Sequence, residues 1–83
     1  MTFKAPDSLS EQIARHLGEL IITGKLKSGE RIQELRVAGE LNVSRGSVRE
    51  AYLILERRHL IDILPRRGAV VSAMTPRHVR NVY

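Results

Sequence analysis

The sequence contains no cysteine and no tryptophan, and its aromatic side chains are limited to Phe3, Tyr52 and Tyr83 among 83 residues. Without thiols the chain cannot form disulfides, which fits a reducing compartment. The few aromatics offer little surface for stacking unpaired bases, as RNA-binding modules do. No apolar run approaches the roughly 20 residues that cross a membrane, and the start lacks a signal-peptide core. These absences predict one small, soluble, cytoplasmic domain that binds no membrane.

Side chains that support catalysis are also sparse. The histidines His16, His59 and His78 lie far apart in the sequence. Neither they nor Asp62 show nucleophile–base or metal-ligand spacing. We therefore expect no enzymatic activity, no catalytic or metal site, and no cofactor in this chain.

Positive charge is in excess, with a formal net charge of +5, and it is unevenly distributed. Residues 1–23 carry two basic and three acidic side chains, whereas residues 24–83 carry twelve basic and six acidic ones. This excess predicts salt-dependent attraction to a phosphate backbone. A solvated basic face without a polyanionic partner is the alternative.

Residues 41–51, with the sequence LNVSRGSVREA, have the pattern of the turn and second helix of a helix-turn-helix. Ser44 is a preferred N-cap, so a helix can begin at Arg45. The apolar stripe of this helix consists of Val48, Ala51, Tyr52 and Leu55. Arg45 and Arg49 lie together beside that stripe, with Ser47 on another flank of the first turn. This arrangement suits the DNA major groove, where arginine pairs bidentately with guanine. A solvated cationic helix start is the alternative.

The remaining segments predict two further helices and a small sheet. The expected helices span about 9–23, 34–41 and 45–58, a short strand spans 31–32, and β-type runs occupy about 61–63 and 69–72. The tip between the last two runs reads Pro65, Arg66, Arg67 and Gly68, where Gly68 supplies the positive φ that such a loop commonly needs. Three helices followed by a basic hairpin predict a winged helix-turn-helix, a mainly α fold with a small β-hairpin. A surface hairpin with incidental arginines is the alternative.

Several sequence blocks, in this order, resemble the GntR family of bacterial transcription regulators over roughly residues 9–72. The blocks are GKLKSGERI at 24–32, VSR at 43–45, VREA at 48–51, LE at 55–56, LI at 60–61 and RRGAVV at 66–71. The resemblance implies a homodimer on an inverted-repeat operator, each recognition helix in a major groove and each wing tip in the adjacent minor groove. The contacts it implies are Ser44, Arg45, Ser47 and Arg49 on the helix, with Arg66, Arg67 and Gly68 on the wing.

The chain departs from the common family pattern at several positions. Members often have Pro at Ser28, Thr-Pro at Gly46-Ser47, Gly at His59 and, in some branches, Arg at Leu35. Gly46 costs about 1 kcal/mol of helix stability relative to alanine but permits a close approach of backbone to phosphate, so it counts among the expected contacts. Arg36, next to Leu35, is the last contact expected.

Two further expectations concern assembly. Leu53 and Ile54 lie off the apolar stripe, and are either isolated exposed aliphatics or contacts to a second subunit or domain. Residues 1–74 are expected to form the DNA-binding domain. Thr75-Pro76 has the pattern of a helix start, so residues 75–83 are expected to begin a linker toward an absent C-terminal effector domain. The resemblance is closest to the branch in which that domain is all-helical.

These observations together predict sequence-specific binding of double-stranded DNA in bacterial transcription regulation, most often as a repressor. A small-molecule effector would act only through the absent domain, and this chain alone would be monomeric or weakly dimeric. A winged helix that binds RNA or a protein partner is the alternative function.

Overall fold

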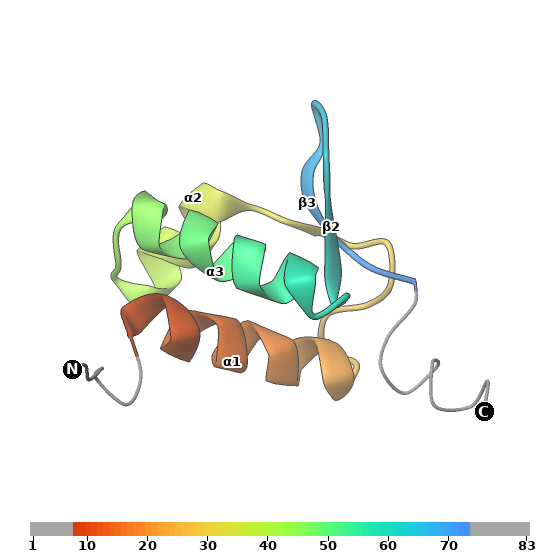
Figure 1. The fold of residues 1–83 in the computed structure, drawn as a ribbon, viewed down its shortest axis with the longest axis horizontal. Coiled ribbons are helices and arrows are strands. Elements are labelled where there is room, and N and C mark those ends of the chain that lie inside the picture. The colour runs from red at the N-terminus through yellow and green to blue at the C-terminus, as the bar shows by residue number, and fades with distance from the viewer. Residues whose placement is uncertain (1–7, 74–83) are drawn as a thin grey trace.

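The computed structural model describes residues 8–73, which form three helices and a three-stranded antiparallel sheet (Figure 1). Along the chain the elements are α1 (Leu9–Ile22), β1 (Arg31–Ile32), α2 (Glu34–Leu41), α3 (Arg45–Arg57), β2 (Ile61–Leu64) and β3 (Gly68–Val71). This arrangement confirms the predicted winged helix-turn-helix. The expected helix start at Thr75-Pro76 lies outside the described residues.

Helices α1 and α3 begin at the residues that their serine N-caps predict. The side chains of Ser8 and Ser44 each accept a hydrogen bond, at 3.1 Å, from the backbone amide three residues later. Asn42 ends α2 in the left-handed region, with a φ of 58°. Helices α1 and α3 end one residue earlier than expected, with Thr23 and Arg58 as their C-caps.

The hydrophobic core lies between the three helices and the base of the sheet, with α1 packed along α3 (Figure 1). Its buried apolar residues are Ile13, Ala14, Leu17, Ile21, Ile32, Val37, Ala38, Val48, Ala51, Tyr52, Leu55, Leu60, Ile61, Ala69 and Val71. All four members of the predicted α3 stripe are among them. Ile54 packs partly against this core, so neither alternative given for it above is needed, whereas Leu53 is 52% exposed.

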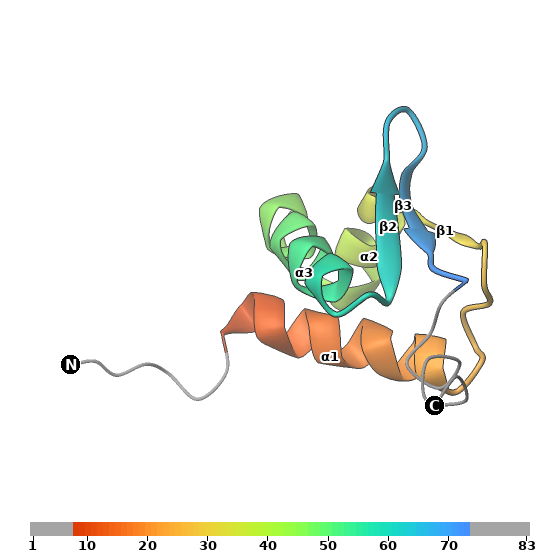
Figure 2. The same ribbon diagram turned by 45° about the vertical axis from the view of Figure 1, so that its right-hand side comes forward.

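The hairpin of β2 and β3 projects beyond the helical body (Figure 2). Strand β3 is central in the sheet and pairs with β2 on one side and β1 on the other. Ile61 and Ile63 share a face by alternation, but Ile61 is buried and Ile63 is 38% exposed. The alternation therefore correctly predicts strand β2, but only its first residue is buried, because the remaining residues extend beyond the helices.

The hairpin tip is a tight turn in which the Arg67 amide donates to the Leu64 carbonyl at 3.2 Å. Pro65 occupies the second position of this turn and Arg66 the third, with a φ of 70°. A proline followed by a residue of positive φ is the pattern of a type II turn, whose third position usually holds glycine or asparagine. Gly68 has the predicted positive φ, 78°. The left-handed Arg66 was not predicted.

A third left-handed residue, His59, follows the end of α3 with a φ of 63°. The His59 amide donates to Glu56 O and the Leu60 amide to Leu55 O, each at 3.0 Å, which is the Schellman pattern. We expect His59→Gly to raise the free energy of unfolding by about 1 kcal/mol, since glycine adopts this conformation without Cβ strain. Urea denaturation would measure the gain. His59→Ala keeps a Cβ, and an equal gain from it would contradict this explanation.

Candidate nucleic-acid interface

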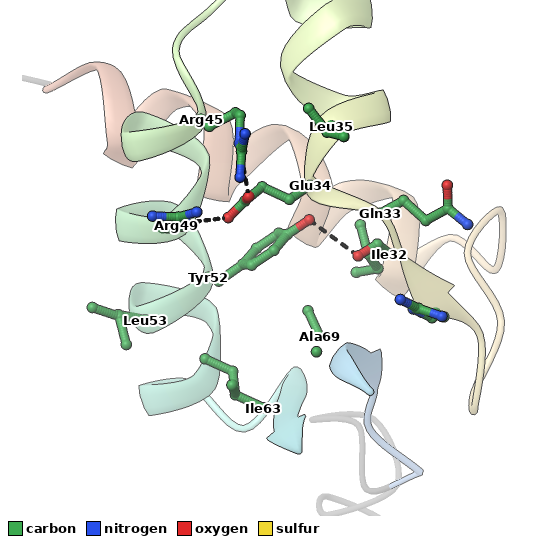
Figure 3. A pocket seen from close by; sticks show the side chains of 12 residues that line it. Ile32, Gln33, Glu34, Leu35, Arg45, Arg49, Tyr52, Leu53, Ile63 and Ala69 are labelled. Atoms are coloured by element: carbon green, nitrogen blue, oxygen red, sulfur yellow. Dashed lines mark hydrogen bonds and ion pairs between the residues drawn. The ribbon is translucent and has the colours of Figure 1, made fainter. Parts of the chain in front are cut away.

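Arg45 and Arg49 lie one turn apart on the exposed side of α3, and both contact Glu34, the first residue of α2 (Figure 3). Arg45 Nε is 3.2 Å from Glu34 Oε1, and Arg49 Nε is 2.5 Å from Oε2. The arginine side chains remain 53% and 61% exposed, against 22% for Glu34. One carboxylate therefore holds two guanidiniums, and the three side chains carry a net positive charge.

The charge of Glu34 is stabilised by its surroundings. The hydrogen bond from Arg49 lowers the pKa of Glu34 below its ordinary value; desolvation opposes this, and Arg45 adds to the lowering. Glu34 also lies in the first turn of α2, where the helix dipole favours an anion. The carboxylate is therefore ionised at neutral pH and keeps both guanidiniums beside it.

Tyr52 lies under this cluster, one turn along α3 from Arg49 (Figure 3). Its hydroxyl donates to the Ile32 carbonyl at 3.2 Å, which joins α3 to β1. Burial, and to a lesser extent the negative charge of Glu34, raise the pKa of Tyr52 to about 12. The phenol is therefore a neutral donor that fixes the distance between α3 and the strand preceding α2.

The pH dependence of the free energy of unfolding at alkaline pH should reveal the raised pKa of Tyr52. Because the pKa of Tyr52 rises from 10.0 to about 12 on folding, the unfolded chain loses this proton first. The stability linked to the neutral phenol is fully present below about pH 10 and is lost as the pH rises toward 12. We expect Tyr52→Phe to lose less stability than the unsubstituted chain over this interval, measured by urea denaturation at each pH. Parallel losses in the two chains would contradict the assignment.

A groove of about 660 Å³ lies between α3, the start of α2 and the hairpin (Figure 3). It is lined by Arg31, Ile32, Gln33, Glu34, Leu35, Arg45, Arg49, Tyr52, Leu53, Ile63, Gly68 and Ala69. Three of these residues are arginines and one is a glutamate, so positive charge predominates. Three exposed aliphatic side chains, Leu35, Leu53 and Ile63, accompany them.

The other predicted contacts of α3 surround the arginines. The hydroxyl oxygens of Ser44 and Ser47 are 2.9 Å apart at the start of the helix. Gly46 is exposed between them, and a Cβ at this position would meet only Ser44 Oγ, at 4.0 Å. The first turn of α3 therefore presents small side chains around Arg45, which leaves space for a partner at the helix end.

The predicted wing residues lie at the far end of the hairpin. Arg66 and Arg67 are exposed in the tip turn, which Figure 2 shows standing away from the helices, and Gly68 lines the groove. Arg36 is not brought to the groove. It pairs with Glu40 at 3.1 Å on the surface of α2 and lines a different hollow, beside the segment preceding β1.

The sequence analysis did not predict a role for Glu34 or Leu35, which line the same groove as the two arginines. Glu34 was visible as an acidic residue in the first turn of a helix, but its partners lie 11 and 15 residues further along. In the sequence, Leu35 is distinguished only as a departure from the family pattern. Its position after Glu34, outside the apolar stripe of α2, is the signal that would have placed it on the same surface.

Within residues 8–73, no group of three or more histidine, aspartate or glutamate side chains could hold a metal ion. A search of the same described residues finds no helix with the length and apolar character needed to span a membrane.

An exposed basic helix that follows a tight turn, with a projecting basic hairpin beside it, defines a winged helix-turn-helix DNA-binding domain. Residues 9–71 match the family described as "Bacterial regulatory proteins, gntR family". The chain belongs to the GntR family, and this domain is the family's DNA-binding domain. The family match confirms the predicted resemblance and classes the chain with transcriptional regulators rather than with enzymes.

Individual relatives support this assignment. The chain is 37% identical over 76 residues to the Gluconate operon transcriptional repressor of Bacillus subtilis, covering 92% of this chain and 31% of that protein. It is 37% identical over 73 residues to the HTH-type transcriptional repressor RspR of Escherichia coli, covering 88% and 32%. A solved putative transcriptional regulator GntR from Rhodococcus sp. RHA1 has a TM-score of 0.79 at 32% identity, covering 89% of this chain and 36% of that one. The chain spans about a third of the length of these curated relatives.

Proposed function

We propose that this chain recognises a specific double-stranded DNA sequence, as the DNA-binding part of a bacterial transcriptional repressor. The observation that supports this most directly is the pair of exposed arginines, Arg45 and Arg49, held by Glu34 at the start of α3. Both ion pairs use Nε, and the two terminal nitrogens of a guanidinium suffice for paired donation to guanine O6 and N7. Holding the side chains in place before binding reduces the conformational entropy lost on contact.

In this proposal α3 enters a major groove and the wing tip reaches the adjacent minor groove. Ser44, Gly46 and Ser47 approach phosphates or base edges, since they are small and surround the arginines. Arg66 and Arg67 contact phosphates or the minor groove, because the hairpin carries them away from the helices. Arg36 ranks last, because its pairing with Glu40 keeps it outside the groove.

The relatives that contain this domain are longer proteins, and the proposal extends to a longer protein of that kind. The gluconate operon repressor and RspR carry the word repressor in their names, and each is about three times the length that matches here. We place residues 1–74 in the DNA-binding domain and residues 75–83 at the start of a linker to an all-helical effector domain. That domain would form the homodimer on an inverted repeat in the cytoplasm and bind a small-molecule effector.

Selection of bound duplexes from a random pool tests the function itself. We expect one short motif to be enriched, and the chain to prefer that duplex over a scrambled duplex and over single-stranded RNA. The logarithm of the association constant should fall linearly with the logarithm of salt concentration, with a slope of about −0.9 per phosphate contact. Equal binding to all three nucleic acids would mean that the chain offers only a non-specific basic surface, and would contradict the proposal. If the chain bound none of the three nucleic acids, a protein partner would be favoured.

The assembly of the chain follows from the same proposal. We expect residues 1–83 to sediment as a monomer at micromolar concentration, since the main dimer surface is proposed to lie in the effector domain. Binding to the two halves of an inverted repeat would then show little cooperativity. A tight dimer in sedimentation would contradict this expectation and make the exposed Leu53 the first interface residue to replace.

A further inference from the structure

The side chain of Leu35 is an apolar group on an otherwise polar part of the groove rim. It is 67% exposed, more than any other large hydrophobic side chain in the described part of the chain. Helix α2 contributes Val37 and Ala38 to the core, so Leu35 is not needed for packing. The domain therefore gains almost no stability from a leucine here.

Leu35 lies on the surface that carries the two arginines. Figure 3 shows Leu35 and Arg45 on either side of Glu34, and all three line the same groove as Arg49. Glu34 is adjacent to Leu35 in the chain and binds both guanidiniums. A DNA base edge read by one of these arginines would therefore enter the groove that Leu35 also lines.

The chemistry of the leucine restricts what it can recognise. Thymine is the only one of the four bases that presents a methyl group, on C5, in the major groove. A leucine side chain has no donor or acceptor, so facing a polar base edge leaves that edge unpaired, while facing a methyl group buries apolar surface on both sides. The surrounding positive charge favours DNA over an apolar protein surface as the occupant.

We infer that Leu35 packs against the C5-methyl of a thymine close to the guanine read by Arg45 or Arg49. Leu35 would thereby set the base preference at one position of each half-site. This inference rests on the proposed function, because it names a further contact of the same DNA-binding surface.

Deoxyuridine differs from thymidine only by this methyl group, and so provides the test. Each thymine of the selected duplex is replaced in turn by deoxyuridine, and binding of the 83-residue chain is measured by fluorescence anisotropy. At one position per half-site we expect the unsubstituted chain to bind about fourfold more weakly, the effect of leaving one methyl group unburied. In Leu35→Ala, deoxyuridine at that position should have no further effect.

Leu53→Ala is the matched control, because Leu53 is another exposed leucine of the same groove. It should keep the fourfold sensitivity at the same thymine. Both variants remove exposed side chains, and their thermal unfolding should confirm that they fold. The inference is overturned if Leu35→Ala remains sensitive to deoxyuridine, or if the unsubstituted chain is not sensitive to it. In either case a preference for the selected duplex over the scrambled one would leave the proposed function intact. Failure to select any duplex overturns both.

Discussion

Arg49→Ala is expected to weaken binding to the preferred duplex about 5- to 150-fold, since a bidentate arginine–guanine pair contributes about 1 to 3 kcal/mol of discrimination. Binding to a scrambled duplex should fall much less, so the ratio between the two duplexes shrinks by a similar factor. Arg45→Ala should act in the same way if Arg45 reads a second guanine. Because Arg45 and Arg49 share Glu34, the two losses should not be additive.

Two control variants separate sequence reading from charge. Arg49→Lys keeps the positive charge but not the planar fork, so it should preserve the salt slope and still lose discrimination. Arg67→Ala removes a cation from the hairpin tip, and should weaken both duplexes about equally and reduce the salt slope by about 1. All binding is measured at several salt concentrations. If Arg67→Ala abolished discrimination and Arg49→Ala left it intact, the wing would be the part that reads sequence.

Among the substitutions proposed here, Leu55→Ala should cause the largest decrease in the free energy of unfolding. Leu55 is fully buried between α1 and the rest of the core, with Leu60 packed beside it. Truncating such a leucine costs about 2 to 5 kcal/mol, and a domain of this size has only about 4 to 12 kcal/mol in total. Thermal unfolding followed by circular dichroism should show the midpoint falling by about 4 to 8 °C per kcal/mol lost.

Leu53→Ala provides the same substitution two residues away on α3, at a side chain that is 52% exposed. Its free energy of unfolding should change by no more than about 0.5 kcal/mol. Losses of similar size in the two variants would mean that helix propensity, rather than the packing of Leu55, determines the effect.

Local signals in the sequence were sufficient for the helices and the general fold. The caps at Ser8, Asn42 and Ser44 depend only on neighbouring residues, and they placed the ends of three helices within one residue. Arg45 and Arg49 were predicted to lie together because four residues complete about one helical turn. Such features follow from spacing alone, so no knowledge of tertiary contacts is needed.

Features that depend on distant residues were not predicted. The pairing of Glu34 with Arg49 joins elements 15 residues apart, and its geometry depends on how α2 packs against α3. The exposure of Ile63 depends on how far the hairpin extends beyond the body, which the alternation of apolar residues does not reveal. The positive φ of Arg66 depends on the turn type that the two strands require. Only the three-dimensional arrangement determines these properties.

The short strand β1 links the wing mechanically to the recognition helix. Ile32 pairs with Ala69 in the hairpin, and two residues further along the chain Glu34 holds Arg45 and Arg49. This short path connects the base of the hairpin to the residue that holds the two guanidiniums. In the proposed complex, a duplex with a different minor-groove width under the wing would displace the hairpin and, through β1, change how deeply α3 meets the bases. The local shape and flexibility of the DNA, at base pairs that no side chain touches, would then contribute to which sites are bound.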